Sequence, residues 1–218
     1  MPNALYLHGF ASGPGAAKSV NQARQLDQVG VRTHVPDLNE GDFEHLTIGR
    51  QLALIERLLD ELRPDLVLGS SLGGYLAALA AARWPDRAPA VVLLAPAFGF
   101  GRRWAKRLGR SKLAEWRRTG RLDVYHYGER RAMPVAPALY EDALQYEPWP
   151  DVRQPALVVH GRFDEVVPAD LSVRFAWGRP NVEVRLLDSD HALTDRLDTI
   201  WDEVSSWRLR LTAFPAAR

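Results

Sequence analysis

The stretch Leu66-Val67-Leu68-Gly69-Ser70-Ser71-Leu72-Gly73-Gly74 joins a short apolar run to a helix of small residues that extends to Trp84. The pattern G-x-S-x-G at such a junction is typical of a serine nucleophile on a sharp strand-to-helix turn. Small neighbours permit the strained backbone of this turn, which holds the hydroxyl above the sheet. Ser71 is the central serine, because Ser70 has leucines at both flanking glycine positions. We therefore expect Ser71 to be a nucleophile; the alternative is a glycine-rich turn with incidental serines.

Six apolar runs of four to six residues recur along the chain, and helical patterns separate them. The runs are residues 4–8, 32–35, 65–69, 90–95, 156–160 and 182–187. Runs that are apolar throughout are typical of strands buried on both faces of a parallel sheet. Apolar residues repeat at helical spacing in residues 48–62 and 200–211. The order predicts an α/β fold with a mainly parallel, doubly wound sheet of about six strands and ligands at the C-terminal strand ends.

About fifty residues separate the run 90–95 from the run 156–160, which indicates an insertion over about residues 99–150. A helical pattern in residues 136–143 ends before Pro148. The chain contains no internal repeat, low-complexity tract or second domain boundary. We expect one domain over residues 1–218, with the insertion forming a helical cap.

The segment 99–131 is strongly basic, with eleven Arg or Lys residues against three acidic ones. Its net charge is +8, whereas the whole chain carries only +1. The apolar residues between the charges are placed to form one side of two short helices that break at Gly109 and Gly120; they are Trp104, Leu108, Leu113 and Trp116. We expect this side to shape an acyl pocket near Ser71. The arginines are either a solvated face or a surface that attracts anionic esters such as acyl-CoA.

A serine nucleophile in such a sheet needs an acid after a later strand and a histidine after the last one. Asp164 lies in the loop after the run 156–160, and His191 in the loop after the run 182–187. This order predicts His191 as the general base and Asp164 as the acid that supports it. Taken singly, Asp164 is also compatible with a loop or helix-cap acid, and His191 with a surface histidine.

Other carboxylates compete less well for the role of the acid. The loop after the fourth run, residues 95–98, contains no carboxylate. Asp188 and Asp190 are too close in sequence to the histidine to approach its ring, and Glu165 should point away from Asp164. Elimination and position therefore both favour Asp164.

The oxyanion hole of such a site needs two backbone N–H donors. The first is expected from Leu72, which follows the nucleophile, and the second from the loop after the first strand. In that loop Phe10 is the first choice and Ala11 the second. Gly9 and Gly13 allow a tight backbone there; the alternative is a merely flexible loop.

The remaining chemistry-bearing residues predict no cofactor and no metal. Cysteine is absent, which excludes disulfides, thiolate catalysis and cysteine-ligated metals. His8 and His160 are interpreted as loop-holding residues, and His34, His45 and His126 have no partner pattern. No metal-ligand spacing, phosphate-binding loop or dinucleotide fingerprint occurs.

Composition argues for an ordinary globular chain, with 46% hydrophobic and 25% charged residues among 218. The skew of 25 Arg against 3 Lys is attributed to coding bias rather than to a nucleic-acid surface. The apolar stretch 4–7 is too short for a signal peptide or a membrane span. We expect a cytoplasmic protein with no membrane span and no nucleic-acid partner, and the sequence leaves its oligomeric state open.

With these residues in view, the chain resembles the α/β-hydrolase superfamily over nearly its full length, and more narrowly the small YqiA-like bacterial esterases. The narrower resemblance rests on Leu5-Tyr6-Leu7-His8-Gly9-Phe10 with Ser12 and Lys18, on Gly69-Ser70-Ser71-Leu72-Gly73-Gly74-Tyr75, and on His191-Ala192. It implies hydrolysis of ester or thioester bonds in a small-molecule substrate without a cofactor. The insertion matches no cap of known preference, so no particular substrate is implied.

The expected chemistry is formation and hydrolysis of an acyl-enzyme on Ser71, as in a carboxylesterase. A thioesterase, lactonase, peptidase or acyltransferase would use the same triad, and only a substrate panel separates them. A non-catalytic binding protein with a hydrolase fold is the alternative from another class, because a fold alone does not establish activity.

Overall fold

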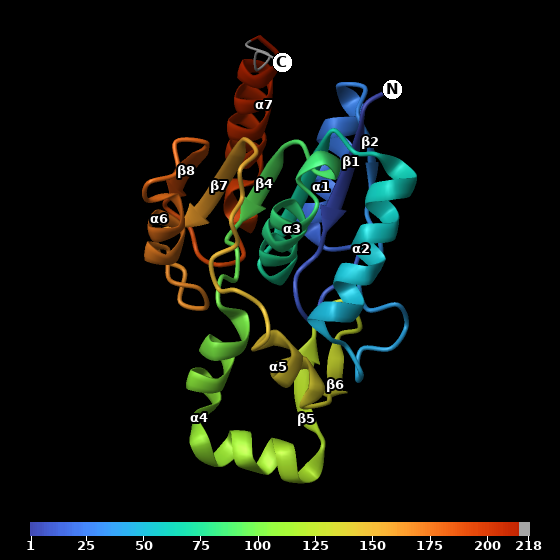
Figure 1. The fold of residues 1–218 in the computed structure, drawn as a ribbon, viewed down its shortest axis with the longest axis vertical. Helices are drawn as coiled ribbons and strands as arrows, with labels where there is room; N and C mark the ends of the chain where they lie inside the picture. The colour runs from blue at the N-terminus through green and yellow to red at the C-terminus, as the bar shows by residue number, and fades with distance from the viewer. Residues whose placement is uncertain (214–218) are drawn as a thin grey trace.

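The computed structural model describes residues 1–213 and contains a six-stranded parallel sheet in the order β2-β1-β3-β4-β7-β8 (Figure 1). The strands are β1 Asn3–Leu7, β2 Arg32–His34, β3 Leu66–Ser70, β4 Val91–Leu94, β7 Ala156–Gly161 and β8 Val182–Leu187. All six predicted strands are confirmed, each end lying within one residue of the predicted one. The chain runs from β1 outward to β2 and then returns to β3 on the other side of β1. The loops after β1 and β3 therefore flank the switch point of the sheet, where ligands bind in such folds.

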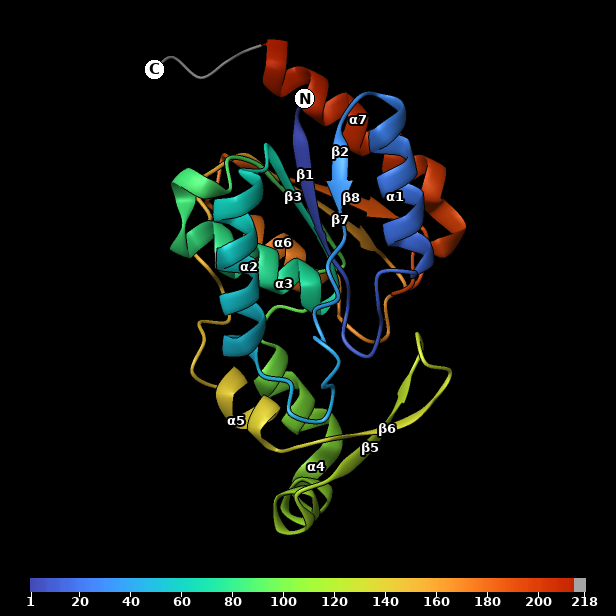
Figure 2. The ribbon, with the colours of Figure 1, turned by 90° about the vertical axis from the view of Figure 1, so that its right-hand side faces the viewer.

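Alternate side chains of each inner strand enter two separate cores, which explains why these strands are apolar throughout. Leu5 and Leu7 face one core, and Ala4 and Tyr6 face the other. Helices α2 Ile48–Leu62 and α3 Leu72–Arg83 cover the first face, while α1 Ala17–Gln28 and α7 Leu197–Ala213 cover the second (Figure 2). None of the helices in residues 1–213 has the length and apolar character needed to span a bilayer.

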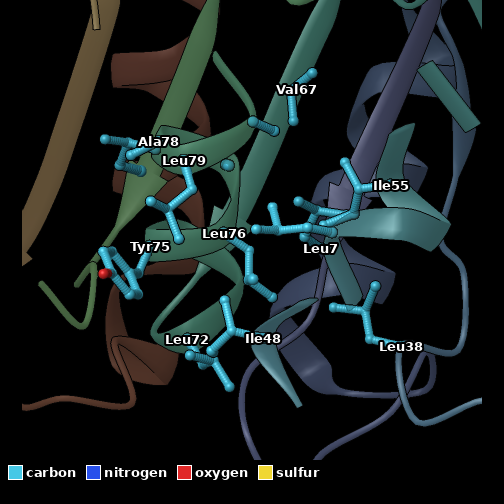
Figure 3. Packing of buried hydrophobic residues seen from close by; sticks show 14 of the residues in the cluster. Leu7, Leu38, Ile48, Ile55, Val67, Leu72, Tyr75, Leu76, Ala78 and Leu79 are labelled. Atoms are coloured by element: carbon cyan, nitrogen blue, oxygen red, sulfur yellow. The ribbon is translucent and has the colours of Figure 1, made fainter. Parts of the chain in front are cut away.

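Helix α3 is buried over nearly its whole length and packs closely against the sheet (Figure 3). Its glycines and alanines permit this approach: a Cβ atom on Gly73 would lie 2.1 Å from the carbonyl oxygen of Leu7. Leu76 is fully buried in the same core, and its replacement by alanine would cost about 2–5 kcal/mol of stability. The small-residue pattern thus brings the N-terminus of α3 down onto the ends of β1 and β3.

The insertion leaves the sheet after β4 and lies beyond the C-terminal ends of the strands (Figure 1). It begins with α4 Phe100–Thr119, which breaks at Gly109 (φ 76°) and ends at Gly120, the two breaks expected from the sequence. It continues with an antiparallel hairpin, β5 Leu122–His126 and β6 Arg131–Val135, and with α5 Ala138–Ala143. Helix α6 Asp170–Ala176 follows β7.

The hairpin was not predicted. Its first strand alternates buried and exposed residues, starting with buried Leu122 and ending with buried His126, as a half-exposed strand does. The second strand shows no such alternation, because it begins with Arg131, directly after Arg130, and contains Pro134. Proline is tolerated here because the hairpin has only two strands, so each strand has a free edge.

Candidate active site

Ser71 lies between the last residue of β3 and the first residue of α3, in a strained conformation with φ 54° and ψ −115°. Gly69 makes this turn possible, because a Cβ atom there would lie 2.1 Å from the carbonyl oxygen of Gly73. The Ser71 N–H donates to the carbonyl of Leu94 (2.8 Å), and the Ser71 carbonyl accepts from the N–H of Ala97 (2.9 Å). The end of β4 and the loop that follows it therefore hold the serine in place, and the Ser71 side chain stays partly exposed.

His191 stands in the loop after β8, with its Nε2 atom 3.0 Å from the Ser71 hydroxyl oxygen. Its Nδ1 atom lies 2.6 Å from a carboxylate oxygen of Asp164. The loop is fixed by Asp190, whose carboxylate accepts the N–H groups of Ala192 and Leu193. Ser71, His191 and Asp164 therefore form one continuous hydrogen-bonded chain.

Asp164 lies in the loop after β7 with both carboxylate oxygens fully partnered. One oxygen accepts from the N–H groups of Val166 (2.9 Å) and Val167 (2.7 Å). The other accepts from His191 and from Nε2 of His160 (3.0 Å). Burial alone would raise the pKa of Asp164, but the hydrogen bonds from His160, His191 and Val167 together outweigh it and hold this pKa well below its usual value. Asp164 is therefore a carboxylate at any pH near neutrality.

His160 is a supporting residue whose contact with Asp164 the sequence did not indicate. It is fully buried, and its Nε2 faces only acceptors, the carboxylate of Asp164 and the carbonyl of Val167 (2.9 Å). Nε2 therefore carries a proton, and Nδ1 is hydrogen-bonded to the hydroxyl of Ser172 (2.7 Å). The interpretation of His160 as a loop-holding residue is too narrow, since it also orients the acid.

Two further contacts in the loop of His191 have no signal in the sequence. Gly161 ends β7, and a Cβ atom there would lie 2.3 Å from the carbonyl oxygen of Asp190, so only glycine lets the histidine loop pack this closely. Lys18 is partly buried and directs its ammonium toward the carbonyl of His191 (3.5 Å). Burial lowers the pKa of Lys18 to about 8, although the charges of Asp164 and Asp190 partly counter this. Lys18 appears in the family resemblance, but the pattern gave no sign of this contact.

The competing acids occupy other positions. Asp188 pairs with Arg162 (3.1 Å) and is exposed, Asp190 binds backbone N–H groups of its own loop, and Glu165 is exposed. None of these three contacts the imidazole of His191 within the described residues.

The proposed oxyanion donors lie on both sides of the switch point. The N–H of Leu72 is the first of α3 and so has no acceptor within the helix. The loop carrying Phe10 approaches Ser71 closely, because a Cβ atom on Gly9 would lie 3.4 Å from that of Ser71. Ala11, the second choice, is held at φ 53° and its side chain is buried.

The ring of Phe10 connects this loop to the cap. Its centroid lies 5.2 Å from Trp104, 5.9 Å from Phe100 and 5.4 Å from Phe43. Trp104 in turn contacts the buried Trp116 at 4.9 Å. Phe10, Phe100 and Trp104 thus form an aromatic cluster that joins the cap to the loop next to Ser71.

Two of the other histidines, His8 and His126, hold neighbouring loops in place. His8 accepts from the N–H of Leu38 (3.0 Å) and contacts the Gly9 carbonyl (2.9 Å). His126, which showed no partner pattern, is buried; it accepts from the N–H of Glu129 (3.1 Å) and contacts the Phe43 ring edge-on. Among residues 1–213, no group of three or more metal-ligating side chains is clustered.

The parallel sheet, the serine turn and the order of the loops define an α/β hydrolase. The chain belongs to the uncharacterised protein family UPF0227, whose model matches residues 3–205. It is 24% identical over 212 residues to the mitochondrial palmitoyl-protein thioesterase ABHD10 of Bos taurus, covering 90% of this chain and 69% of that relative.

Solved structures agree with this fold. The α/β-hydrolase domain-containing protein 10 from mouse has a TM-score of 0.80 and 20% identity, covering 97% of this chain and 91% of that one. Est1E from Butyrivibrio proteoclasticus with ferulic acid bound has a TM-score of 0.77 and 23% identity, covering 98% and 90%. At these identities the likeness establishes the fold, and activity must be argued from the site.

Proposed function

We propose that this protein is a serine hydrolase that cleaves carboxylic esters or thioesters of small molecules through an acyl-enzyme on Ser71. The observation that carries the proposal is the continuous chain from the Ser71 hydroxyl through His191 to Asp164, with contacts of 3.0 and 2.6 Å. The strained turn at Ser71 adds support, because such strain is found where a side chain must be presented for chemistry.

The protonation states follow from the partners. The Asp164 carboxylate accepts the Nδ1 proton of His191, which leaves Nε2 free to accept the proton of Ser71. The serine oxygen attacks the acyl carbonyl as His191 takes this proton, and the imidazolium then protonates the leaving alcohol or thiol. Water activated by His191 adds to the acyl carbon, and the acid is released.

In this proposal the N–H groups of Leu72 and Phe10 stabilise the oxyanion. The positive end of α3 points toward the same place, which favours the developing negative charge. The aromatic cluster of Phe10, Phe100 and Trp104 would form the apolar wall against which the substrate packs.

We propose both esters and thioesters as substrates. Because one relative is a thioesterase, thioesters should be tested first. Lactonase, peptidase and acyltransferase activities are the other outcomes of a substrate panel. A cytoplasmic location stays a prediction from the sequence.

The test compares wild-type protein with Ser71→Ala on p-nitrophenyl esters and acyl thioesters of two to eight carbons, together with labelling by a fluorophosphonate. We expect labelling only when Ser71 is present, and a loss of about 10³-fold or more in kcat for the alanine variant. Absence of both labelling and turnover would favour a non-catalytic binding protein.

A further inference from the structure

The first turn of α4 contacts both sides of the candidate active site. Phe100 and Trp104 face the ring of Phe10 in the proposed oxyanion loop. Arg103, one residue before Trp104, donates from Nη2 to the carbonyl oxygen of Val166. The cap therefore extends an aromatic side toward one loop and a guanidinium toward the loop that holds the acid.

Val166 connects Arg103 directly to Asp164. The N–H of Val166 donates to the Asp164 carboxylate (2.9 Å), while its carbonyl accepts from Arg103. The backbone of one residue, Val166, thus separates the guanidinium from the proposed catalytic acid. No carboxylate in residues 1–213 lies within ion-pair distance of it, although the charges of Asp164 and Asp170 act on it from farther away.

Partial burial makes this position unfavourable for a cation that has no bound ligand. Arg103 is partly buried, and this burial lowers its pKa despite Asp164 and Asp170. Arg107 stands one helical turn further on, and like charges at this spacing destabilise a helix. A guanidinium carries five N–H donors, and the only hydrogen bond described for this one goes to Val166. An anion bound to Arg103 would offset the free-energy cost of partly burying this guanidinium beside another cation.

The chemistry of the proposed function indicates which part of a substrate lies nearby. In hydrolysis of a thioester the bond between the acyl carbon and sulfur breaks, the water oxygen joins the acyl carbon, and His191 gives the thiol its proton. The leaving group therefore lies beside His191, whose imidazole contacts Asp164 (2.6 Å). Arg103 approaches the same loop from the cap.

We propose that Arg103 binds an anionic group on the leaving part of the substrate. The preferred substrate is then an ester or thioester whose alcohol or thiol carries a carboxylate or phosphate a few atoms from the bond that breaks. This inference rests on the proposed function for the identity of the leaving group. It also differs from long-range attraction by the basic segment 99–131, because it assigns a direct contact with the substrate to one residue, Arg103.

Binding can be measured without turnover in the Ser71→Ala background. The probes are S-butyryl thioglycolate, its neutral isostere S-butyryl mercaptoacetamide, and 2-(butyrylthio)ethyl phosphate. Calorimetry should show the two anionic probes binding about tenfold more tightly than the amide, as one charge-assisted contact predicts. Adding Arg103→Gln should remove this preference, and Arg103→Lys should retain part of it. The anionic probe that loses more affinity identifies carboxylate or phosphate as the preferred group.

The matched control is Arg118→Gln, at the exposed far end of α4, which should leave the preference unchanged. Circular dichroism and Tm establish that each variant is folded. The proposal is overturned if the parent shows no anionic preference, if Arg103→Gln weakens all three probes equally, or if both glutamine variants behave alike. Failure of the proposed function would appear separately, as wild-type protein that hydrolyses none of the probes.

Discussion

Replacing Gly161 by alanine would place a methyl group 2.3 Å from the carbonyl oxygen of Asp190 and 2.4 Å from that of Ser189. Ordinary contact begins near 3.4 Å, so the loop that carries His191 must move by about 1 Å. The distance from His191 Nε2 to the Ser71 hydroxyl would then rise from 3.0 Å to about 4 Å, beyond a hydrogen bond.

A displacement of 1 Å in a catalytic group costs about 10²-fold in rate. The overpacking itself should cost about 1–3 kcal/mol, which lowers Tm by several degrees in a chain of this size. Stopped-flow or steady-state hydrolysis of p-nitrophenyl butyrate, measured well below Tm, separates the two effects. We expect kcat/KM to fall about 100-fold while the circular dichroism spectrum is retained.

The matched control is Gly15→Ala, because a Cβ atom on Gly15 has no neighbour within 4 Å and this backbone needs no left-handed φ. It should keep both Tm and kcat/KM. Near-wild-type turnover in folded Gly161→Ala would refute the reasoning, since it would show that the His191 loop does not set the rate.

Three other outcomes follow from the same site. Asp164→Asn should lower kcat by about 10³–10⁴-fold, because the imidazole of His191 loses the acceptor that sets its tautomer. It should also lower Tm while the fold is retained, because an amide NH2 group replaces a buried oxygen that accepts two hydrogen bonds. A rate close to wild type would assign the role to another carboxylate. Burial lowers the pKa of Lys18 to about 8 in the folded state, below its unfolded value, so between about pH 8 and 10 the unfolded chain binds more protons and stability gains with rising pH. The Tm of wild type should therefore rise relative to Lys18→Met from pH 7.5 to pH 10, and parallel Tm curves would contradict this burial. EDTA should leave ester hydrolysis unchanged, and activity lost on chelation and restored by a divalent ion would contradict a triad acting alone.

The sheet and the three residues of the candidate site could be predicted because their signals in the sequence are local. A strand buried on both faces leaves an uninterrupted apolar run, and each loop after such a run adds its residue at the same edge of the sheet. Ser71, Asp164 and His191 could therefore be placed together from strand order alone. The breaks of α4 at Gly109 and Gly120 were predicted in the same local way.

The supporting contacts depend on distances between segments, which a single sequence does not contain. His160 orients Asp164 only because the acid loop folds back onto the strand, and Lys18 reaches His191 from a helix 173 positions away. Arg103 was counted among eleven basic residues, and nothing in that run distinguished it from Arg118. Only the structure distinguishes Arg103 from Arg118, through its hydrogen bond to the carbonyl of Val166.

The direct pairing of β4 with β7, in which Val91 lies opposite Ala156, means that the whole cap is a single crossover between neighbouring strands. The entropic free-energy cost of closing such a crossover rises by only about 0.6 kcal/mol for each doubling of its length. The sheet thus constrains where the cap begins and ends and very little of what lies between. Replacing this segment would therefore be a means of changing which molecules reach the candidate site, while Ser71, His191 and Asp164 keep their positions.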